Sequence, residues 1–459
     1  MTFKLSLFQR WLAMLSLFVG ISLGANAESV NIDGLYYELN SPKTGKATLT
    51  YQNTTTSNYS SLPVSVAIPE KVTYNGNEYT VTTIADRAFA NCTSLESISI
   101  PGSVTSIGTA QYCSTSDNTY AGTSLPFYKC TSLKSIRFED GNATLSLGSA
   151  YYNNGPSDYY YTYGKGLFYY SPLEEVYLGR NVQYIDYSTS STFIGNPIKY
   201  GYSAFYNQSK LTKVTIGPEV ESLPKYLFYK CTAIELVINL ALTPNVAGSY
   251  SFSTYSATLY YPLESESKYA TADVWKLFDN KYGMYSEGSM LFIPTAASEA
   301  MVTLYPGSSP ETLAVPATIN SNGTQLTVTK VMDKAFEACP DLTLVQLPST
   351  LTEIGEEAFA RNIKLSSITF TGQKVIGKGA FTDCPSITSL ALPNSLETIG
   401  DRAFKNNTGI TSVSFGTGLK NIESEAFYGC SALTAARMPE MLDTIKASAF
   451  ENCVKLTYV

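Results

Sequence analysis

Residues 354–370 read IGEEAFARNIKLSSITF, and residues 399–415 repeat that frame as IGDRAFKNNTGITSVSF. Through the C-terminal part of the chain a Phe recurs every 22 or 23 residues, each time directly after an Ala. These residues are Phe336, Phe359, Phe381, Phe404, Phe427 and Phe450. The same frame occurs earlier, spread out by insertions, at Phe89, Phe127, Phe168, Phe205 and Phe228. Eleven copies in one frame predict an array of stacked units in which the Phe side chains form a core column.

Each unit also predicts one short strand. A Cys or Asn follows three residues after the Phe, and apolar residues then alternate, as in Leu365, Ile368 and Phe370. A period of about 20 to 29 residues with this pattern is the signature of a leucine-rich repeat. We therefore predict a β-rich repeat solenoid: two tandem leucine-rich repeat arrays with short parallel strands, each array preceded by a small β module.

The unit I-G-x-x-A-F-x-x-C-x-x-L-x-x-I-x-[IFL]-P resembles the BspA-like leucine-rich repeats of bacterial surface proteins, of the type common in Bacteroidetes. Residues 257–262 read ATLYYP, and Tyr269 and the WKLF of residues 275–278 follow; this resembles the segment that closes repeat arrays in that family. The resemblance implies a surface protein that adheres to host proteins or to other cells. It implies no particular chemistry, because a solenoid is a scaffold.

The N-terminus predicts export. Lys4 and Arg10 precede an apolar run from Trp11 to Leu23, and the small residues 25–27 offer a cleavage site. The run is too short for a transmembrane helix, and no second apolar stretch of spanning length follows. We expect a protein that is secreted or held at the cell surface, with no transmembrane segment in the mature chain.

The predicted organisation has six parts. They are a signal peptide (1–27), a β module (28–84), a repeat array with Tyr-rich insertions (85–240), a capping segment (241–285), a second β module (286–331) and a second array (332–459). A helix is expected around Lys268–Phe278, and a strand over Leu313–Ile319. The final repeat stops without a second cap, which predicts either a longer natural chain or an end protected by dimerisation.

Composition excludes several function classes. The chain has no His, which removes Ser-His-Asp and Cys-His catalysis and most transition-metal sites. No glycine-rich nucleotide loop or calcium loop is present, so we expect no cofactor and no metal. A net charge of −7 argues against nucleic acid as a partner. Paired carboxylates are not excluded by composition, but an enzyme is the disfavoured class.

The cysteines occupy a structural position. Seven of the eight lie three residues after a repeat Phe, where Asn362 and Asn407 stand in other repeats. A position shared by Cys and Asn predicts a buried turn in which a reduced side chain packs or bonds backbone groups, with a disulfide or a ligand role as the alternative. Cys113, inside an insertion, lacks this explanation. The seven are Cys92, Cys130, Cys231, Cys339, Cys384, Cys430 and Cys453.

The candidate binding site lies in the first array. Of 35 Tyr residues, 32 precede residue 290, and many lie in insertions at 109–125 and 141–166, which we read as loops. Tyr with Ser, Gly and Asn is the composition of antibody paratopes, although such loops also pack on their own scaffold. The predicted site combines these loops with outward positions of the first sheet and serves cell-surface adhesion or host-protein binding. The alternative is a glycan-binding accessory protein in which exposed Tyr residues stack on sugar rings. The expected partner is a protein or a glycan on another cell or matrix. Its residues are Tyr159, Tyr160, Tyr161, Tyr163, Arg137, Glu175, Tyr177 and Lys213.

Overall fold

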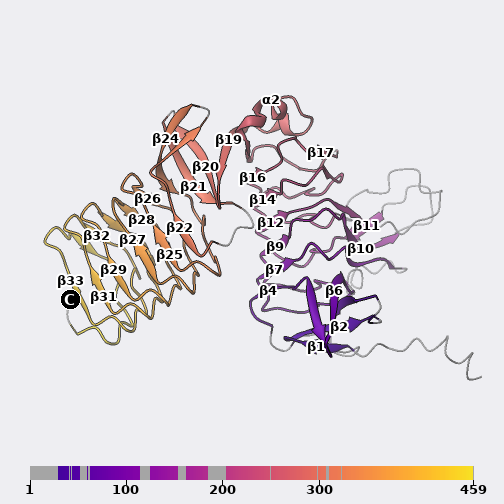
Figure 1. The fold of residues 1–459 in the computed structure, drawn as a ribbon, viewed down its shortest axis with the longest axis horizontal. Helices are drawn as coiled ribbons and strands as arrows, with labels where there is room; N and C mark the ends of the chain where they lie inside the picture. The colour runs from indigo at the N-terminus through magenta and orange to yellow at the C-terminus, as the bar shows by residue number, and fades with distance from the viewer. Residues whose placement is uncertain are drawn as a thin grey trace, which may run out of the picture. The chain divides into compact units, whose positions relative to one another are not determined.

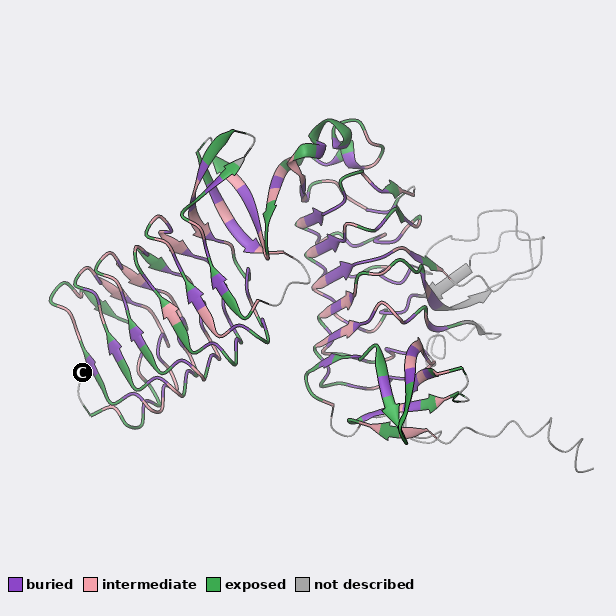
Figure 2. Ribbon diagram, in the orientation of Figure 1, coloured by how far each residue is buried: buried purple, intermediate pink, exposed green. Residues whose placement is uncertain are grey.

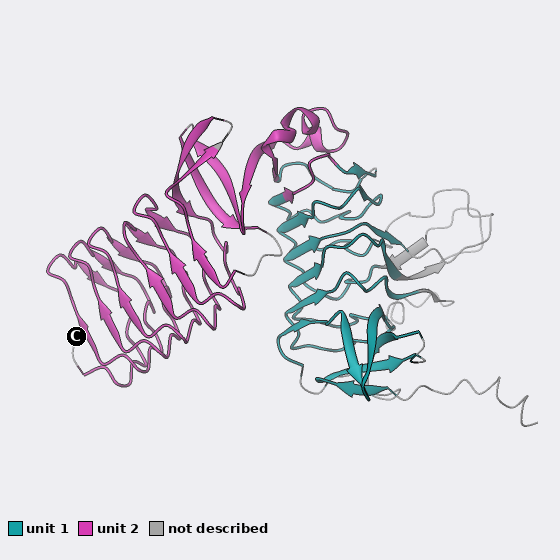
Figure 3. Ribbon diagram, in the orientation of Figure 1, with its two compact units in different colours: residues 1–237, 245–257 teal, residues 238–244, 258–459 magenta. Residues whose placement is uncertain are grey.

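The computed structural model describes residues 29–40, 42, 44–51, 59, 62–113, 125–153, 162–184, 203–248, 250–296, 298–305, 310–321 and 323–457. The predicted signal peptide lies outside these residues. The chain forms two compact units, one of residues 1–237 with 245–257 and the other of residues 238–244 with 258–459 (Figure 3). The division falls inside the segment that the sequence suggested as a cap, so residues 245–257 belong to the first unit and residues 258–285 to the second.

The first unit begins with a small β module. The strands β1 (Val30–Ile32), β2 (Leu35–Leu39) and β3 (Lys46–Thr50) pair antiparallel in that order. The strands β5 (Lys71–Tyr74) and β6 (Asn77–Ile84) form the hairpin that Asn75 and Gly76 predict. Both turn residues have positive φ, 49° and 77°, which the hairpin turn requires and which Asn and Gly tolerate best.

Two parallel ladders run through the first array (Figure 1). One contains β4 (Ser65–Ala67), β7 (Ser97–Ile100), β9 (Ser135–Phe138), β12 (Glu175–Leu178), β14 (Lys213–Ile216) and β16 (Leu236–Asn239). The other contains β6, β8 (Ser106–Cys113), β10 (Leu145–Asn153) and β13 (Val182–Tyr184), and the pair β15 (Ser222–Leu223) and β17 (Val246–Ala247) lies further along the chain. Because β4 lies within residues 28–84, this sheet starts before the first repeat Phe.

The insertions are partly strands, where the sequence predicted loops. Residues 109–113 extend β8 and residues 149–153 extend β10, and these extensions stay paired in parallel as far as Tyr152 and Cys113. The strand β11 (Thr162–Lys165) then returns antiparallel to β10. Tyr and Thr favour a pleated strand, so an insertion rich in them lengthens a ladder that is already present.

The second unit opens with a short helical segment and a meander. After β18 (Thr258–Pro262) come the turns η2 (Leu263–Ser265), α2 (Glu266–Tyr269) and η3 (Trp275–Leu277). The single helix expected over Lys268–Phe278 is wrong, because Val274 has a φ of 68° and breaks it. The strands β19 (Asn280–Glu287), β20 (Met290–Ala296) and β21 (Glu299–Leu304) pair antiparallel in sequence, and β21 is parallel to β24 (Thr324–Val331).

Residues 313–319 are not one strand either. Pro316, which cannot donate to a ladder, separates β22 (Thr312–Ala314) from β23 (Thr318–Ser321), and β23 forms a hairpin with β24. β22 starts a ladder with β25 (Leu344–Gln346) and β27 (Ser367–Thr369); β29 (Ser389–Ala391), β31 (Ser412–Ser414) and β33 (Ala435–Arg437) form another. A second parallel ladder begins at β24, and each of its strands pairs with the next. After β24 it contains β26 (Glu353–Ile354), β28 (Val375–Ile376), β30 (Thr398–Ile399), β32 (Asn421–Ile422) and β34 (Thr444–Ile445).

The predicted Phe columns form the cores of both arrays. Figure 2 colours each residue by its burial, and buried positions recur along the strands of both arrays. From Phe336 to Phe450 successive ring centroids lie 5.2 to 5.4 Å apart and every pair is stacked. From Phe89 to Phe228 the spacing is 5.0 to 5.5 Å, and Phe252 continues the column. Each buried Phe contributes roughly 1.5 to 3 kcal/mol of transfer free energy, so the columns are a main source of stability. The prediction of a core column is confirmed.

The position shared by Cys and Asn is buried, as predicted. All seven repeat cysteines are free and buried. The Cys384 thiol donates to the Phe359 carbonyl of the preceding repeat at 3.2 Å, and the Asn407 amide donates to Phe381 in the same way at 2.9 Å. Both residue types therefore supply a side-chain donor to a backbone carbonyl of the preceding repeat.

Candidate functional site

Two of the predicted site residues, Arg137 and Tyr177, touch on adjacent strands of the first array. They are aligned in register, and the Arg137 guanidinium carbon lies 3.5 Å from the centroid of the Tyr177 ring. Arg137 Nε donates to Glu139 at 2.7 Å, and the Tyr177 hydroxyl donates to Asp140 at 2.6 Å. Burial raises the pKa of Tyr177, and the hydrogen bond to Asp140 raises it further.

Tyr177 is only 5 % exposed, so its ring does not present the open contact surface that the alternation of the strand suggested. The reason is its stacking under Arg137 and its bond to Asp140. Glu175 and Lys213, also in register, form an ion pair at 2.6 Å. The structure thus places these four residues on neighbouring strands as two paired sets, and a ligand at this face would meet Arg137, Glu175 and Lys213 before Tyr177.

The other predicted residues come from the insertion. Tyr159, Tyr160 and Tyr161 lie outside the described residues. Tyr163 belongs to β11, the strand that leads the chain directly into Phe168 and the repeat that follows. In the second array, outward sheet residues such as Ser389, Ala391 and Ser412 are small and exposed.

A further row of aromatic residues was not predicted as part of the binding site. In the first array the residue directly after the repeat Phe is Tyr in four successive repeats: Tyr128, Tyr169, Tyr206 and Tyr229. The signal was present in the sequence as the runs FYK, FYY, FYN and FYK. Tyr169 is exposed, and Tyr128, Tyr206 and Tyr229 are partly exposed. We call the set of Tyr128, Tyr169, Tyr170, Tyr206, Tyr226, Tyr229 and Tyr250 the tyrosine ridge.

The ridge rings pack against one another in two groups. In the first, Tyr170 makes edge-on contacts with Tyr128 at 4.8 Å and with Tyr169 at 4.9 Å between centroids. The Lys129 ammonium lies 5.3 Å from the Tyr128 ring centroid. Tyr169 is 42 % exposed, so the group presents aromatic area to solvent on a supported base.

The second group extends over three repeats. Tyr229 lies 6.2 Å from Tyr206 and meets Tyr226 edge-on at 5.4 Å. Tyr226 stacks on Tyr250 at 5.3 Å with an interplanar angle of 6°. Tyr250 is 60 % exposed, and Lys230 lies 5.4 Å from the Tyr206 ring. Rings that hold one another in place lose little side-chain entropy on binding, as recognition surfaces built on Tyr do.

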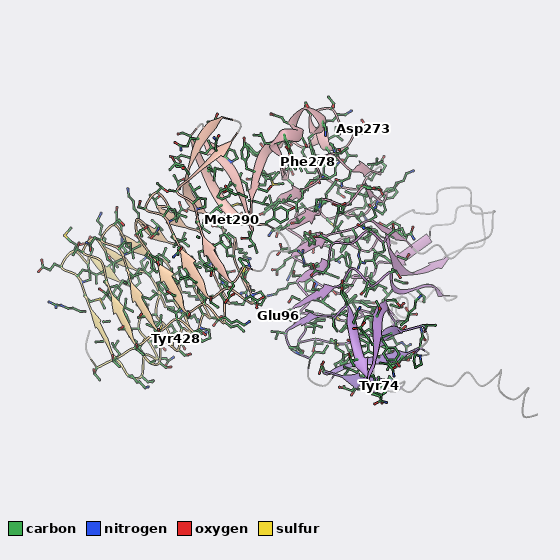
Figure 4. The ribbon with its side chains drawn as sticks, in the orientation of Figure 1. Tyr74, Glu96, Asp273, Phe278, Met290 and Tyr428 are labelled. Carbon is green, nitrogen blue, oxygen red and sulfur yellow. The ribbon has the colours of Figure 1, made fainter. Side chains whose placement is uncertain are left out.

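The same edge of the second array carries ion pairs between repeats. Arg402 and Lys405 both bond Glu425, at 3.0 and 2.6 Å, and these bonds lower the pKa of Glu425 to about 2. Lys378 pairs with Glu356 at 2.6 Å in the same manner. One Tyr, Tyr428, follows a repeat Phe there, and Lys405 lies 4.8 Å from its ring (Figure 4). The two arrays share a scaffold but present different chemistry on this edge.

The described ranges hold no group of three or more His, Cys, Asp and Glu side chains placed to share a metal ion. Within the same residues, no helix is both long and apolar enough to cross a membrane.

The stacked Phe columns, the paired parallel ladders and the Cys or Asn turns define a leucine-rich repeat protein. The family model of the BspA type leucine rich repeat region matches residues 71–193, 162–265 and 329–457, with six copies. The chain belongs to this family.

Several solved structures resemble the chain, whereas no curated protein matches it. A leucine rich cell surface protein from Faecalibacterium prausnitzii is 20% identical, with 94% of this chain and 93% of that one covered and a TM-score of 0.32. A leucine-rich repeat protein from Bacteroides ovatus is 18% identical over 94% and 99%, with a TM-score of 0.26. One from Eubacterium ventriosum is 16% identical over 92% and 93%, with a TM-score of 0.33.

Proposed function

We propose that the chain is a non-catalytic recognition protein, secreted or held at the bacterial cell surface, whose first repeat array binds a protein or a glycan on another cell or on matrix. The observation that carries the proposal is the tyrosine ridge. Its exposed rings stand on the first array, at the position where the second array has ion pairs between repeats. Membership of a family of surface repeat proteins supports the same role.

The binding surface in this proposal joins three parts of the first array. The ridge supplies aromatic area, and the insertion with Tyr159, Tyr160, Tyr161 and Tyr163 adds more in the repeat that contains Tyr169. Arg137, Glu175 and Lys213 supply charge on the sheet, with Tyr177 supporting Arg137 from below. Loops and turns carry binding while repeats supply rigidity, so an array with insertions is the natural place for a partner.

Binding of the exported chain, residues 28–459, to wells coated with basement-membrane extract and to suspended cells of another bacterium tests the proposal. The ridge variant combines Tyr169→Ser, Tyr226→Asn and Tyr250→Asn. Asn is chosen at two positions because Tyr226 and Tyr250 have φ of 63° and 59°, which Asn tolerates. The control variant combines Tyr74→Ser, Tyr282→Ser and Tyr428→Ser, exchanges of three Tyr outside the ridge. Figure 4 labels Tyr74 and Tyr428.

We expect the wild type and the control variant to bind alike and the ridge variant to bind at least about tenfold more weakly, since buried aromatic anchors dominate interface energies. Urea unfolding of all three proteins checks that the fold is kept. Failure of the wild type to bind either surface, or equal binding by the ridge variant, would contradict the proposal.

A further inference from the structure

The turns around the repeat Phe residues differ in charge between the two arrays. From three residues before to three residues after each Phe, the five repeats of the first array contain five basic residues and one acidic residue. The six repeats of the second array contain five basic and eight acidic residues over the same positions. A chain with a net charge of −7 therefore has a basic edge, and that edge is the one with the tyrosine ridge.

The basic residues stand beside the rings. Lys129 and Lys230 are exposed, and their ammonium groups lie 5.3 and 5.4 Å from the ring centroids of Tyr128 and Tyr206. Lys225, also exposed, directly precedes Tyr226. A ligand on this edge thus meets tyrosine rings and positive charge together. The apolar face of a pyranose ring has C–H groups that pack on the negative face of an aromatic ring, and a carboxylate on the same sugar pairs with an ammonium.

The ridge also repeats along the array axis. The contacts Tyr128–Tyr170, Tyr206–Tyr229 and Tyr226–Tyr250 each join one repeat to a later one, at 4.8, 6.2 and 5.3 Å. Stacked repeats advance by about 4.8 Å, the spacing of neighbouring strands. A linear polymer lying along the axis meets rings at successive repeats and positive charge at the repeats of Phe127 and Phe228, whereas a single small sugar uses one repeat only. The geometry favours a chain of sugars.

We infer that the tyrosine ridge binds an acidic polysaccharide, a linear glycan that carries carboxylate groups, with its sugar rings on the tyrosines and its carboxylates at Lys129, Lys225 and Lys230. This inference rests on the proposed function and names the class of partner. The overall negative charge of the protein repels polyanions elsewhere on the surface, so binding is confined to the basic edge.

Affinity electrophoresis in native gels tests the inference with the full exported chain. The gels contain hyaluronan or polygalacturonate as acidic glycans, dextran as a neutral glycan, or single-stranded DNA as a polyanion of another class. The lysine variant combines Lys129→Asn, Lys225→Gln and Lys230→Asn. Its charge-matched control combines Lys334→Asn, Lys378→Gln and Lys446→Gln, which lie in ion pairs of the second array. The ridge variant is run beside them.

We expect at least one acidic glycan to retard the wild type and the charge-matched control, with weaker retardation at high salt because the charge contacts are screened. The ridge and lysine variants should each bind at least about tenfold more weakly, since each loses three contacts of one kind. Dextran should not retard any of them, and DNA should retard the wild type less than the acidic glycan does.

Three outcomes would overturn the inference. Equal retardation by DNA, lost in the lysine variant and kept in the ridge variant, would mean general polyanion binding without sugar recognition. Binding to matrix or cells through the ridge, without retardation by either acidic glycan, would leave the proposed function standing and point to a protein partner instead. Failure to bind matrix, cells and glycans together would remove both proposals.

Discussion

The Oδ1 atom of Asn362 accepts a hydrogen bond from the backbone N–H of Cys339, one repeat earlier, at 2.7 Å. The same side chain donates from Nδ2 to the carbonyls of Phe336 and Phe359, both at 2.9 Å. Where the position is Cys, the thiol makes the bond to the earlier carbonyl, as Cys430 does to Phe404 at 3.3 Å. Cys and Asn interchange because each joins a turn to the one before it.

Replacing Asn362 distinguishes this role from simple packing. Asn362→Ala leaves the Cys339 N–H and the Phe336 carbonyl buried without their partner, which should cost about 1 to 3 kcal/mol in the free energy of unfolding. Asn362→Cys restores the donor to the carbonyl and should cost less. Urea unfolding of the three proteins gives the comparison, and equal losses for Ala and Cys would show that volume alone matters at this position.

The repeat cysteines should be reduced in the folded protein, because all seven are buried at hydrogen-bonding turn positions. Labelling with a thiol reagent should be near zero in buffer. It should reach at least seven groups in denaturant without any reductant. Labelling of one group or none in denaturant would mean disulfides and would remove this explanation of the repeat.

Alkaline pH should destabilise the fold through the same thiols. Burial raises the pKa of Cys231, Cys339 and Cys384 from 9.0 to about 12. Below pH 9.0 these thiols are protonated in both states, so their contribution is constant. Between 9.0 and about 12 the unfolded chain ionises first, and stability falls by up to about 1.4 kcal/mol per pH unit for each thiol.

Urea unfolding at rising pH measures this slope. Cys384→Ala should lower stability at neutral pH, because it leaves a cavity and removes one of the two side-chain hydrogen bonds to the Phe359 carbonyl, yet it should make the alkaline decline shallower. Tyrosine ionisation in the unfolded chain adds to the decline of both proteins and cancels in the comparison. An unchanged slope in the variant would show that the thiol is not the group responsible.

The insertion tyrosines should take part in binding. Replacing Tyr159, Tyr160, Tyr161 and Tyr163 together by Ser should weaken binding to matrix or to an identified partner by about a hundredfold or more, roughly 3 kcal/mol. The unfolding transition should stay where it is, since the change lies in an insertion and spares the Phe column. Binding that survives the change would limit the site to the ridge and the sheet.

The sequence predicted those features that repeat. The Phe column and the buried Cys or Asn turn follow from residue type at a fixed spacing, and both are present. Contacts between side chains of neighbouring strands and unusual backbone angles could not be predicted, because the repeat period does not determine them. Tyr177 is buried because its ring stacks under Arg137 on the neighbouring strand. The alternation of the strand predicted that both side chains face outward, but it did not predict this contact. Val274, with a φ of 68°, lies between α2 and η3 and interrupts the single helix expected over Lys268–Phe278.

The ridge is a different case, because its signal was in the sequence. Tyr128, Tyr169, Tyr206 and Tyr229 keep the period of the Phe beside them, so they looked like part of the repeat frame. Their significance appears only once Tyr226 and Tyr250, at another offset, come to lie against Tyr229 at 5.4 and 6.4 Å. Tyrosines directly after the repeat Phe and tyrosines two residues before it thus form one surface. A pattern that follows one position of the repeat at a time does not predict contacts between two positions.

Hydroxyl-radical footprinting of the exported chain, alone and bound to matrix or to an acidic polysaccharide, tests most directly that recognition belongs to the first array. Mass spectrometry reads the oxidation of each exposed side chain. The account predicts strong protection of Tyr169 and Tyr250 on binding, with no change at Tyr428 or Met441 in the second array. Protection at Tyr428 and Met441 while Tyr169 and Tyr250 stay fully reactive would contradict it.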